Sequence, residues 1–392
     1  MEERFNQLNS LLIKYRHLWQ LEPFQLCDYP EHWPLPLIEA LEQLEQPELD
    51  NLDSDRQREK SLFAPFIDDL DALITLCQIS PTSKRPLPEL SARFSAGIKG
   101  RKWQQIIDFC SSIPSGDTYL EWCAGKGHLG KALAKIDNAE VQSVEWQLDL
   151  CVQGQEKANK EGLKIHFTHA DVLKGEADAL IQSHQHSVAL HACGELHLSL
   201  LRKASAKGTQ NISIAPCCYH LIPNDIYCPL SEAAQGSALR LSKHDLKLAV
   251  QQSVTSGDRS RRLRHKEMIW RLGFDELQKL VNQSSEYLPL PSFPKQLLSQ
   301  NFQKFCQWAT QEKSLMLPTS IDFDSFEKKG AKRYAMVQRI DSVRHVFRRA
   351  IEVWLILDRC LFLREKGYEV NLGLFCKFED SPRNALITAT KR

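Results

Sequence analysis

The stretch YLEWCAGKGHLG, residues 119–130, places three glycines at positions 125, 127 and 130 directly after an apolar segment. Glycines at this spacing let a chain turn tightly from a strand into a helix, so that backbone N–H groups and the helix N-terminus approach a ligand closely. Such a turn suits a pyrophosphate, and it suits the carboxylate of a methionine moiety equally well. The motif therefore predicts a nucleotide-binding α/β fold and leaves the cofactor open.

Five short apolar segments follow one another from residue 118 onward, and helical patterns separate them. The segments occupy residues 118–122, 141–146, 164–171, 187–194 and 211–218, and helices are expected from residue 128, over 148–158 and over 196–206. Strands that alternate with helices predict a parallel, doubly wound sheet with right-handed crossovers. Two further strand-like segments near the C-terminus flank a turn at residues 381–384, which predicts a hairpin.

Four regions are expected along the chain. Helical periodicity and proline-rich links predict a helical N-terminal accessory region over residues 1–95, followed by the first five strands of the α/β core over 96–220. Residues 221–340 are expected to form a basic helical insert. A long helix at about 342–366 and the terminal hairpin then complete the core over 341–392.

Composition bounds the class of protein. With 392 residues, 42% of them hydrophobic, the chain is typical of globular proteins and not of disordered or collagen-like ones. Its first residues include Glu2 and Glu3 and have helical spacing, unlike a secretory signal or a transit peptide. No apolar run approaches the roughly 18 residues of a membrane span. Twelve cysteines without a secretory signal predict reduced thiols, so we expect a cytoplasmic protein.

Three carboxylates near the glycine turn favour S-adenosylmethionine over NAD. Glu121 lies inside the strand before the turn, where it could meet the ammonium of a methionine moiety and would repel a pyrophosphate. Glu145 ends the second strand and can accept hydrogen bonds from ribose hydroxyls, and Asp171 ends the third strand and can face an adenine amino group. An NAD oxidoreductase is the alternative, and a solvated position at the sheet edge is the alternative for Glu121. The full set of candidate cofactor residues is Glu121, Cys123, Gly125, Gly127, Glu145, Asp171, Val172 and His191.

Four blocks in this order resemble a known family. EWCAGKGHLG, VALHACG, APCCYH and SPRNALI are similar to the class I methyltransferase domain shared by the glutathione S-transferase C-terminal-domain-containing protein, the methyltransferase-like 25 proteins and, more distantly, the tRNA acceptor-stem 2′-O-methyltransferase. The resemblance covers about residues 95–220 and 340–392. It implies a Rossmann-like seven-stranded sheet whose last strand runs antiparallel, and S-adenosylmethionine as cofactor. Relatives often carry an Asp where this chain has Leu198, so no role of that Asp transfers.

Strand-end histidines and cysteines are the catalytic candidates, namely His191, Cys193, Cys217 and His220. Ligands in open α/β sheets bind beyond the carboxyl ends of the strands, so these groups should lie near the transferred methyl. For an oxygen nucleophile, His191 or His220 could take the proton. For carbon-5 of a pyrimidine, a cysteine thiolate would first add to the ring. A third interpretation is that Cys193 and Cys217 are small buried residues only.

Cys217, Cys218, His220 and Cys228 are a further candidate set of metal ligands. Adjacent cysteines followed by this spacing do not reproduce the C-x2-C pairs of zinc sites, so the sequence predicts no metal.

Charge is unevenly distributed along the chain. Residues 1–90 contain 8 basic and 17 acidic side chains, whereas residues 220–350 contain 21 basic and 13 acidic ones. The acidic helices are a candidate surface for a protein partner. The basic segments could bind RNA phosphates, with Trp270 and Tyr334 available for stacking and the candidate substrate residues Arg261, Arg262, Arg264 and Lys266. The simpler alternative is that cations such as Arg344, Arg348 and Lys366 only solvate a helix face.

Together these features predict an S-adenosylmethionine-dependent methyltransferase that acts on RNA, either tRNA or rRNA. The alternatives are a protein or small-molecule methyltransferase and a non-catalytic cofactor-binding scaffold.

Overall fold

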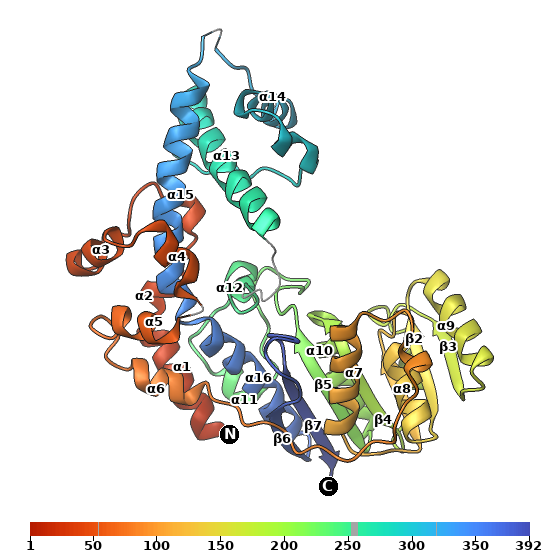
Figure 1. The fold of residues 1–392 in the computed structure, drawn as a ribbon. Helices are drawn as coiled ribbons and strands as arrows, with labels where there is room; N and C mark the ends of the chain where they lie inside the picture. The colour runs from red at the N-terminus through yellow and green to blue at the C-terminus, as the bar shows by residue number, and fades with distance from the viewer. Residues whose placement is uncertain (54, 252–257, 319) are drawn as a thin grey trace. The chain divides into compact units, whose positions relative to one another are not determined.

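The computed structural model describes residues 1–53, 55–251, 258–318 and 320–392 (Figure 1). Contacts group the chain into two compact units. The sheet unit consists of Met1–Lys14, the described part of Asp71–Val254, and Arg348–Arg392, and the helical unit consists of the described parts of Tyr15–Leu70 and Thr255–Phe347. The N-terminal region and the insert expected from the sequence therefore each contribute to both units.

Seven strands form one sheet in the sheet unit. They are β1 (Thr118–Trp122), β2 (Glu140–Glu145), β3 (Ile165–His169), β4 (His186–Cys193), β5 (Asn211–Cys217), β6 (Tyr368–Leu374) and β7 (Ala385–Lys391), in the order β3-β2-β1-β4-β5-β7-β6. The pairs among β1 to β5 are parallel, and β7 runs antiparallel to both β5 and β6. The predicted seven-stranded α/β fold and its terminal hairpin are confirmed.

Helices cover both faces of this sheet. From β1, the chain moves outward through α8 (His128–Ile136) and α9 (Leu148–Lys160), whereas α10 (Glu195–Lys207) connects β4 to β5 in the opposite direction. Right-handed crossovers in opposite directions place their helices on opposite faces. The reversal between β1 and β4 is a topological switch point, beyond whose carboxyl ends ligands bind in such sheets.

Further helices complete the sheet unit. Those long enough to pack on the sheet are α7 (Gly100–Ser112), which contacts α8, and α16 (Arg348–Glu365), which contacts β6 and β7. The helix α1 (Glu2–Lys14) packs on α16, and the ring centroids of Phe5 and Trp354 lie 5.3 Å apart. Shorter elements are α6 (Leu70–Leu76), α11 (Glu232–Gln235), α12 (Lys243–Leu248) and the 3-10 helices Ala92–Ser95 and Asp178–Leu180.

Two long helices, α13 (Asp258–Asn282) and α15 (Phe323–His345), form the centre of the helical unit (Figure 1). Their backbones approach closely at Gly330, where an added Cβ would lie 2.4 Å from the carbonyl oxygen of Ile269. A buried ion pair between Arg333 and Asp275 joins the same helices. The remaining elements are α2 (Arg16–Trp19), α3 (Leu35–Glu42), α4 (Gln46–Leu52), α5 (Arg56–Phe63), α14 (Phe302–Glu312) and the 3-10 helices Pro23–Gln25 and Lys295–Ser299.

The single helix expected over 342–366 is two helices, because α15 ends at His345 and α16 begins at Arg348. The N–H groups of Val346 and Phe347 donate to carbonyls three residues earlier, which closes α15 with a tightened last turn. Among the described residues, no helix combines the length and the apolar character needed to cross a membrane.

Candidate functional site

Three residues with left-handed backbone conformations lie at the carboxyl ends of adjacent strands. Cys123 follows β1 with φ 60°, His191 lies near the end of β4 with φ 69°, and Cys218 follows β5 with φ 46°. A non-glycine residue in this region costs about 1–3 kcal/mol, and such strain concentrates at functional sites. The carboxyl edge of β1, β4 and β5 is therefore the candidate site.

Each of the three glycines in the turn after β1 is required for a different structural reason. An added Cβ at Gly125, where φ is +58°, would meet no atom within 4 Å, so this position offers open space to a ligand. Gly127 caps α8 with φ 65°, and a Cβ there would lie 2.3 Å from Cζ of Phe167. At Gly130 a Cβ would lie 2.5 Å from Oε2 of Glu121. Gly125 is thus free to face a ligand, whereas the other two permit close packing.

The carboxylate of Glu145 connects the end of β2 to this turn. Its Oε2 accepts a hydrogen bond from the N–H of Gly125 at 2.8 Å, and its Oε1 accepts one from the N–H of Gln147 at 3.0 Å. The acceptor expected for ribose hydroxyls therefore lies directly beside the open glycine.

Glu121 lies beneath the turn, inside the sheet. Its side chain is 3% exposed, so a solvated position at the sheet edge is excluded. Ser143 Oγ donates to its Oε2 at 2.7 Å. Burial raises the pKa of Glu121 to about 7, although the hydrogen bonds from Ser143 and from the Gly130 N–H oppose this shift. A neighbouring ammonium would favour the ionised form of this carboxyl.

The end of β3 adds a carboxylate and apolar surface. Asp171 Oδ1 accepts the N–H of Leu173 at 3.0 Å, and this bond lowers the pKa of Asp171. Val172 is buried, and its carbonyl accepts Lys203 Nζ. Trp146 and Leu173 are 66% and 53% exposed beside the two strand-end carboxylates. Sequence analysis missed Trp146, although its position directly after Glu145 was a usable signal. Apolar side chains next to carboxylates suit an adenosine group, so the donor and acceptor set fits S-adenosylmethionine.

His191 is oriented by α7. Its Nε2 lies 2.9 Å from Oε1 of Gln105, and Gln105 Nε2 donates to the carbonyl of Asp380 at 2.6 Å. Because that carbonyl can only accept, Oε1 of Gln105 faces His191 and accepts its Nε2–H. Nδ1 of His191 is then the unprotonated nitrogen. Burial and the nearby Lys102 lower the pKa of His191, which keeps the ring neutral. No sequence signal connects Gln105 to a residue 86 positions away.

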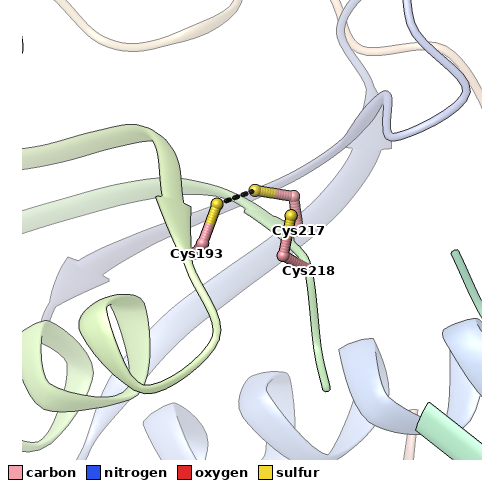
Figure 2. Close-up of side chains that lie close together, drawn as sticks. All are labelled: Cys193, Cys217 and Cys218. Carbon is pink, nitrogen blue, oxygen red and sulfur yellow. Dashed lines mark hydrogen bonds between the residues drawn. The ribbon is translucent and has the colours of Figure 1, made fainter. Parts of the chain in front are cut away.

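Three thiols gather where β4 and β5 end, and Figure 2 shows the sulfurs of Cys193 and Cys217 turned toward each other. These two Sγ atoms are 3.6 Å apart, and the Sγ atoms of Cys193, Cys217 and Cys218 all lie within 4.8 Å of one another. Hydrogen bonds from the other two thiols lower the pKa of Cys218, and the hydrogen bonds to Cys193 and Cys218 raise the pKa of Cys217. Cys217 is therefore a poor thiolate, and Cys218 is the favoured one.

His220 is half-buried near this group, but it is not among the side chains that lie within 4.8 Å of one another. Burial lowers the pKa of His220. Its Nδ1 has no hydrogen-bond partner among the described residues. Cys228 is exposed and likewise outside the group.

The cations of the insert divide into exposed and engaged ones. Arg261, Arg262 and Arg264 are exposed at the start of α13. In contrast, Lys266 Nζ donates to the carbonyls of Leu298 and Gln300.

The expected stacking role of Trp270 and the alternative of a solvated helix face at Arg344 and Arg348 are both wrong. Trp270 is 1% exposed within an apolar cluster, so it cannot stack on a nucleic acid. Arg344 and Arg348 are buried rather than solvated, and Arg344 Nε donates to the carbonyl of Trp19 at 3.1 Å. The polar sequence of these long helices suggested a solvated face, but the guanidinium of Arg344 instead pairs with the carbonyl of Trp19 and the carboxylate of Asp341 inside the fold.

Comparisons with known proteins agree with this fold. A family model described as a methyltransferase domain matches residues 101–225. The glutathione S-transferase C-terminal domain-containing protein of Xenopus laevis is 31% identical over 132 residues, which cover 32% of this chain and 21% of that protein. Its Drosophila melanogaster homolog is 30% identical over 146 residues, which cover 34% of this chain and 23% of that protein. The match thus spans less than a quarter of either relative.

A solved structure of a Synechocystis PCC 6803 magnesium protoporphyrin IX methyltransferase with bound SAH has a TM-score of 0.31 and 9% identity, covering 78% of this chain and 89% of that chain. A similarity this slight supports no conclusion about function.

The family match confirms the resemblance drawn from the sequence. Residues 101–225 match a methyltransferase domain, and they contain the five parallel strands of the sheet.

Proposed function

We propose that the chain is an S-adenosylmethionine-dependent methyltransferase whose substrate is RNA, tRNA or rRNA, in the reducing cytosol that its twelve free cysteines favour. The observation that carries the RNA assignment is the set of exposed cations on the helical unit. Arg262 and Arg264 on α13 and Lys328, Lys329 and Lys332 on α15 are exposed and form no ion pair with the described residues. Cations without acidic partners are suited to phosphates.

The residues Glu121, Gly125, Glu145 and Asp171 would hold the cofactor, which supplies an electrophilic methyl group when bound. A substrate hydroxyl beyond β4 must lose a proton as the methyl is transferred. His191 Nδ1 is the proton acceptor in this proposal, because its Nε2–H is taken by Gln105 and its lowered pKa leaves the ring neutral. Gln105 is a positioning residue that maintains this tautomer.

Addition of Cys217 to a pyrimidine is the less favoured chemistry, because the raised pKa of Cys217 opposes formation of its thiolate. Methyl transfer to oxygen through His191 is therefore the mechanism that the site supports best.

The test is transfer of tritiated methyl from S-adenosylmethionine by the full chain into total RNA and total protein from cells that lack it. Nuclease-sensitive label is expected, and His191→Ala should lose it while the exposed His166→Ala retains it. Label in protein alone would overturn the RNA proposal and turn attention to the acidic N-terminal helices as a docking surface. Absence of label from both would indicate a small-molecule substrate or a non-catalytic scaffold.

A further inference from the structure

The three thiols at the ends of β4 and β5 come together through specific backbone features. Cys193 and Cys217 are register partners on adjacent parallel strands, and the register of β4 shifts between Leu190 and Cys193. Such an irregularity re-aims a side chain at the end of a strand. Cys218 then adopts φ 46°, and its sulfur lies in the same group as those of its neighbours (Figure 2). Two local distortions thus converge on one cluster of sulfur atoms.

The spacing of these atoms matches the requirements of a metal ion. Two sulfurs bound to a tetrahedral zinc at about 2.3 Å lie about 3.8 Å apart. The Sγ atoms of Cys193 and Cys217 are 3.6 Å apart, and the largest separation in the group is within 4.8 Å. A rotation of the half-buried Cys218 side chain that moves its sulfur by about 1 Å would bring this sulfur into the same geometry.

We propose that Cys193, Cys217 and Cys218 bind a zinc ion through three thiolates, with the fourth position open to an exchangeable ligand. Three protein ligands and one open position are typical of catalytic zinc sites, whereas structural sites are closed by four. The location agrees with this type of site, because β4 and β5 end at the same edge of the sheet as the glycine turn after β1.

A disulfide between Cys193 and Cys217 is the competing explanation for their proximity. Such a disulfide would involve two of the three sulfurs and would not explain the left-handed backbone conformation of Cys218. A metal ion uses all three. The predicted absence of a metal rested on residues 217–228, whose spacing is unlike a zinc motif, and the third thiol comes from a strand 24 residues earlier.

The experiment is a titration of the full chain with cobalt(II) chloride, after reduction, removal of metals with a chelator and a count of free thiols. We expect one equivalent to produce thiolate-to-cobalt charge-transfer absorption and the intense ligand-field bands of tetrahedral cobalt, and zinc sulfate to abolish both. Cys193→Ser and Cys218→Ser should each weaken cobalt binding by at least about tenfold. Cys228→Ser, an exposed cysteine outside the group, should match the wild type.

Fully reduced wild-type protein without these bands would overturn the proposal, as would a Cys193→Ser variant that binds cobalt like the wild type. Far-UV circular dichroism verifies that each variant is folded. Binding of S-adenosylhomocysteine, followed by thermal shift on the same samples, separates this proposal from the proposed function. Wild-type protein that binds S-adenosylhomocysteine but not cobalt would refute the zinc site alone.

Discussion

The N–H of Gly125 donates to Oε2 of Glu145 at 2.8 Å, so the turn after β1 and the end of β2 form one connected surface. Glu145→Ala should weaken the affinity for S-adenosylhomocysteine by about 10- to 100-fold, because hydrogen bonds to a charged group contribute about 1.5–3 kcal/mol. Isothermal titration calorimetry measures this change. Glu140→Ala, an exposed carboxylate at the other end of β2, is the control and should bind normally. Equal affinities of the two variants would contradict the placement of the ribose acceptor.

Substitution of Gly125 should mainly weaken cofactor binding, whereas substitution of Gly127 should mainly lower the stability of the fold. Gly125→Ala adds a Cβ in open space, so its only cost is the left-handed backbone conformation that alanine must adopt. We expect a loss of about 1–2 kcal/mol in the free energy of unfolding. Cofactor binding should fall much more, since the methyl enters the space proposed for the ligand. Gly127→Ala places its Cβ 2.3 Å from Phe167 and should destabilise the fold more strongly. Urea unfolding measures the stability of both variants, and calorimetry measures their cofactor affinity. A Gly127→Ala protein more stable than Gly125→Ala would contradict this prediction.

The raised pKa of Glu121 predicts how stability changes with pH. Its pKa is about 7 in the fold against an ordinary value of 4.5, so the folded state binds the proton more tightly than the unfolded chain does. The contribution of this group is fully present below pH 4.5 and is lost as the pH rises through 7. The shift corresponds to about 3 kcal/mol.

Glu121→Gln removes this titration while keeping the shape of the side chain. The stability of the variant relative to wild type should therefore increase between about pH 5 and about pH 7.5 and level off above that range. Thermal unfolding across this range gives the difference directly. Parallel stability curves for the two proteins would mean that Glu121 has an ordinary pKa.

Much of the sheet was predictable from local pattern. The glycine turn, the five strand ends and the hairpin depend on apolar periodicity and on turn residues within a few positions of one another, and all lie within a residue or two of their expected places. The break between α15 and α16 was not predictable, because helical periodicity continues through Val346 and Phe347. Only tertiary packing, in which Phe347 is fully buried, distinguishes these residues from a continuing helix.

The site was predictable to the level of strand ends and no further. The position of Glu145 and Asp171 after their strands was enough to place them at one edge. The partner of His191 is Gln105, which comes from a helix before the first strand, and no spacing rule connects the two. The burial of Trp270 likewise follows from the aromatic cluster around it, which a charge-rich sequence does not reveal.

The exposed lysines of α15 give a test of RNA binding by the helical unit. Lys328, Lys329 and Lys332 line one surface hollow, together with Asp322, Asp324 and Ser325. Changing all three lysines to Ala should weaken RNA binding and reduce the slope of log affinity against log salt by about 2, since each lost phosphate contact removes about 0.7–0.9. Fluorescence anisotropy at several salt concentrations measures both quantities. A triple change at Lys295, Lys304 and Lys313, outside α15, should leave the slope nearer to wild type, and identical slopes in all proteins would count against this surface.

Arg359 supports the end of β4 from within the fold. It is fully buried on α16, and its Nε donates to Nε2 of His197 at 2.9 Å, while Nδ1 of His197 donates to the carbonyl of Ala192 at 2.9 Å. Arg359→Leu leaves the buried imidazole nitrogen without a donor and should reduce the free energy of unfolding by about 1–3 kcal/mol. Arg364→Leu on the exposed side of the same helix should change it by less than about 0.5 kcal/mol.

Urea unfolding compares the stabilities of the Arg359→Leu and Arg364→Leu variants. Cofactor affinity is a second measurement on Arg359→Leu. Because Ala192 lies between His191 and Cys193, release of its carbonyl from His197 should disturb His191 of the proposed reaction site and Cys193 of the proposed zinc site. Methyl transfer should therefore fall in Arg359→Leu even at temperatures where the protein remains folded, while S-adenosylhomocysteine affinity at the β1 and β2 ends changes little. A variant that loses stability but keeps full methyl transfer would show that the β4 end keeps its conformation without this contact.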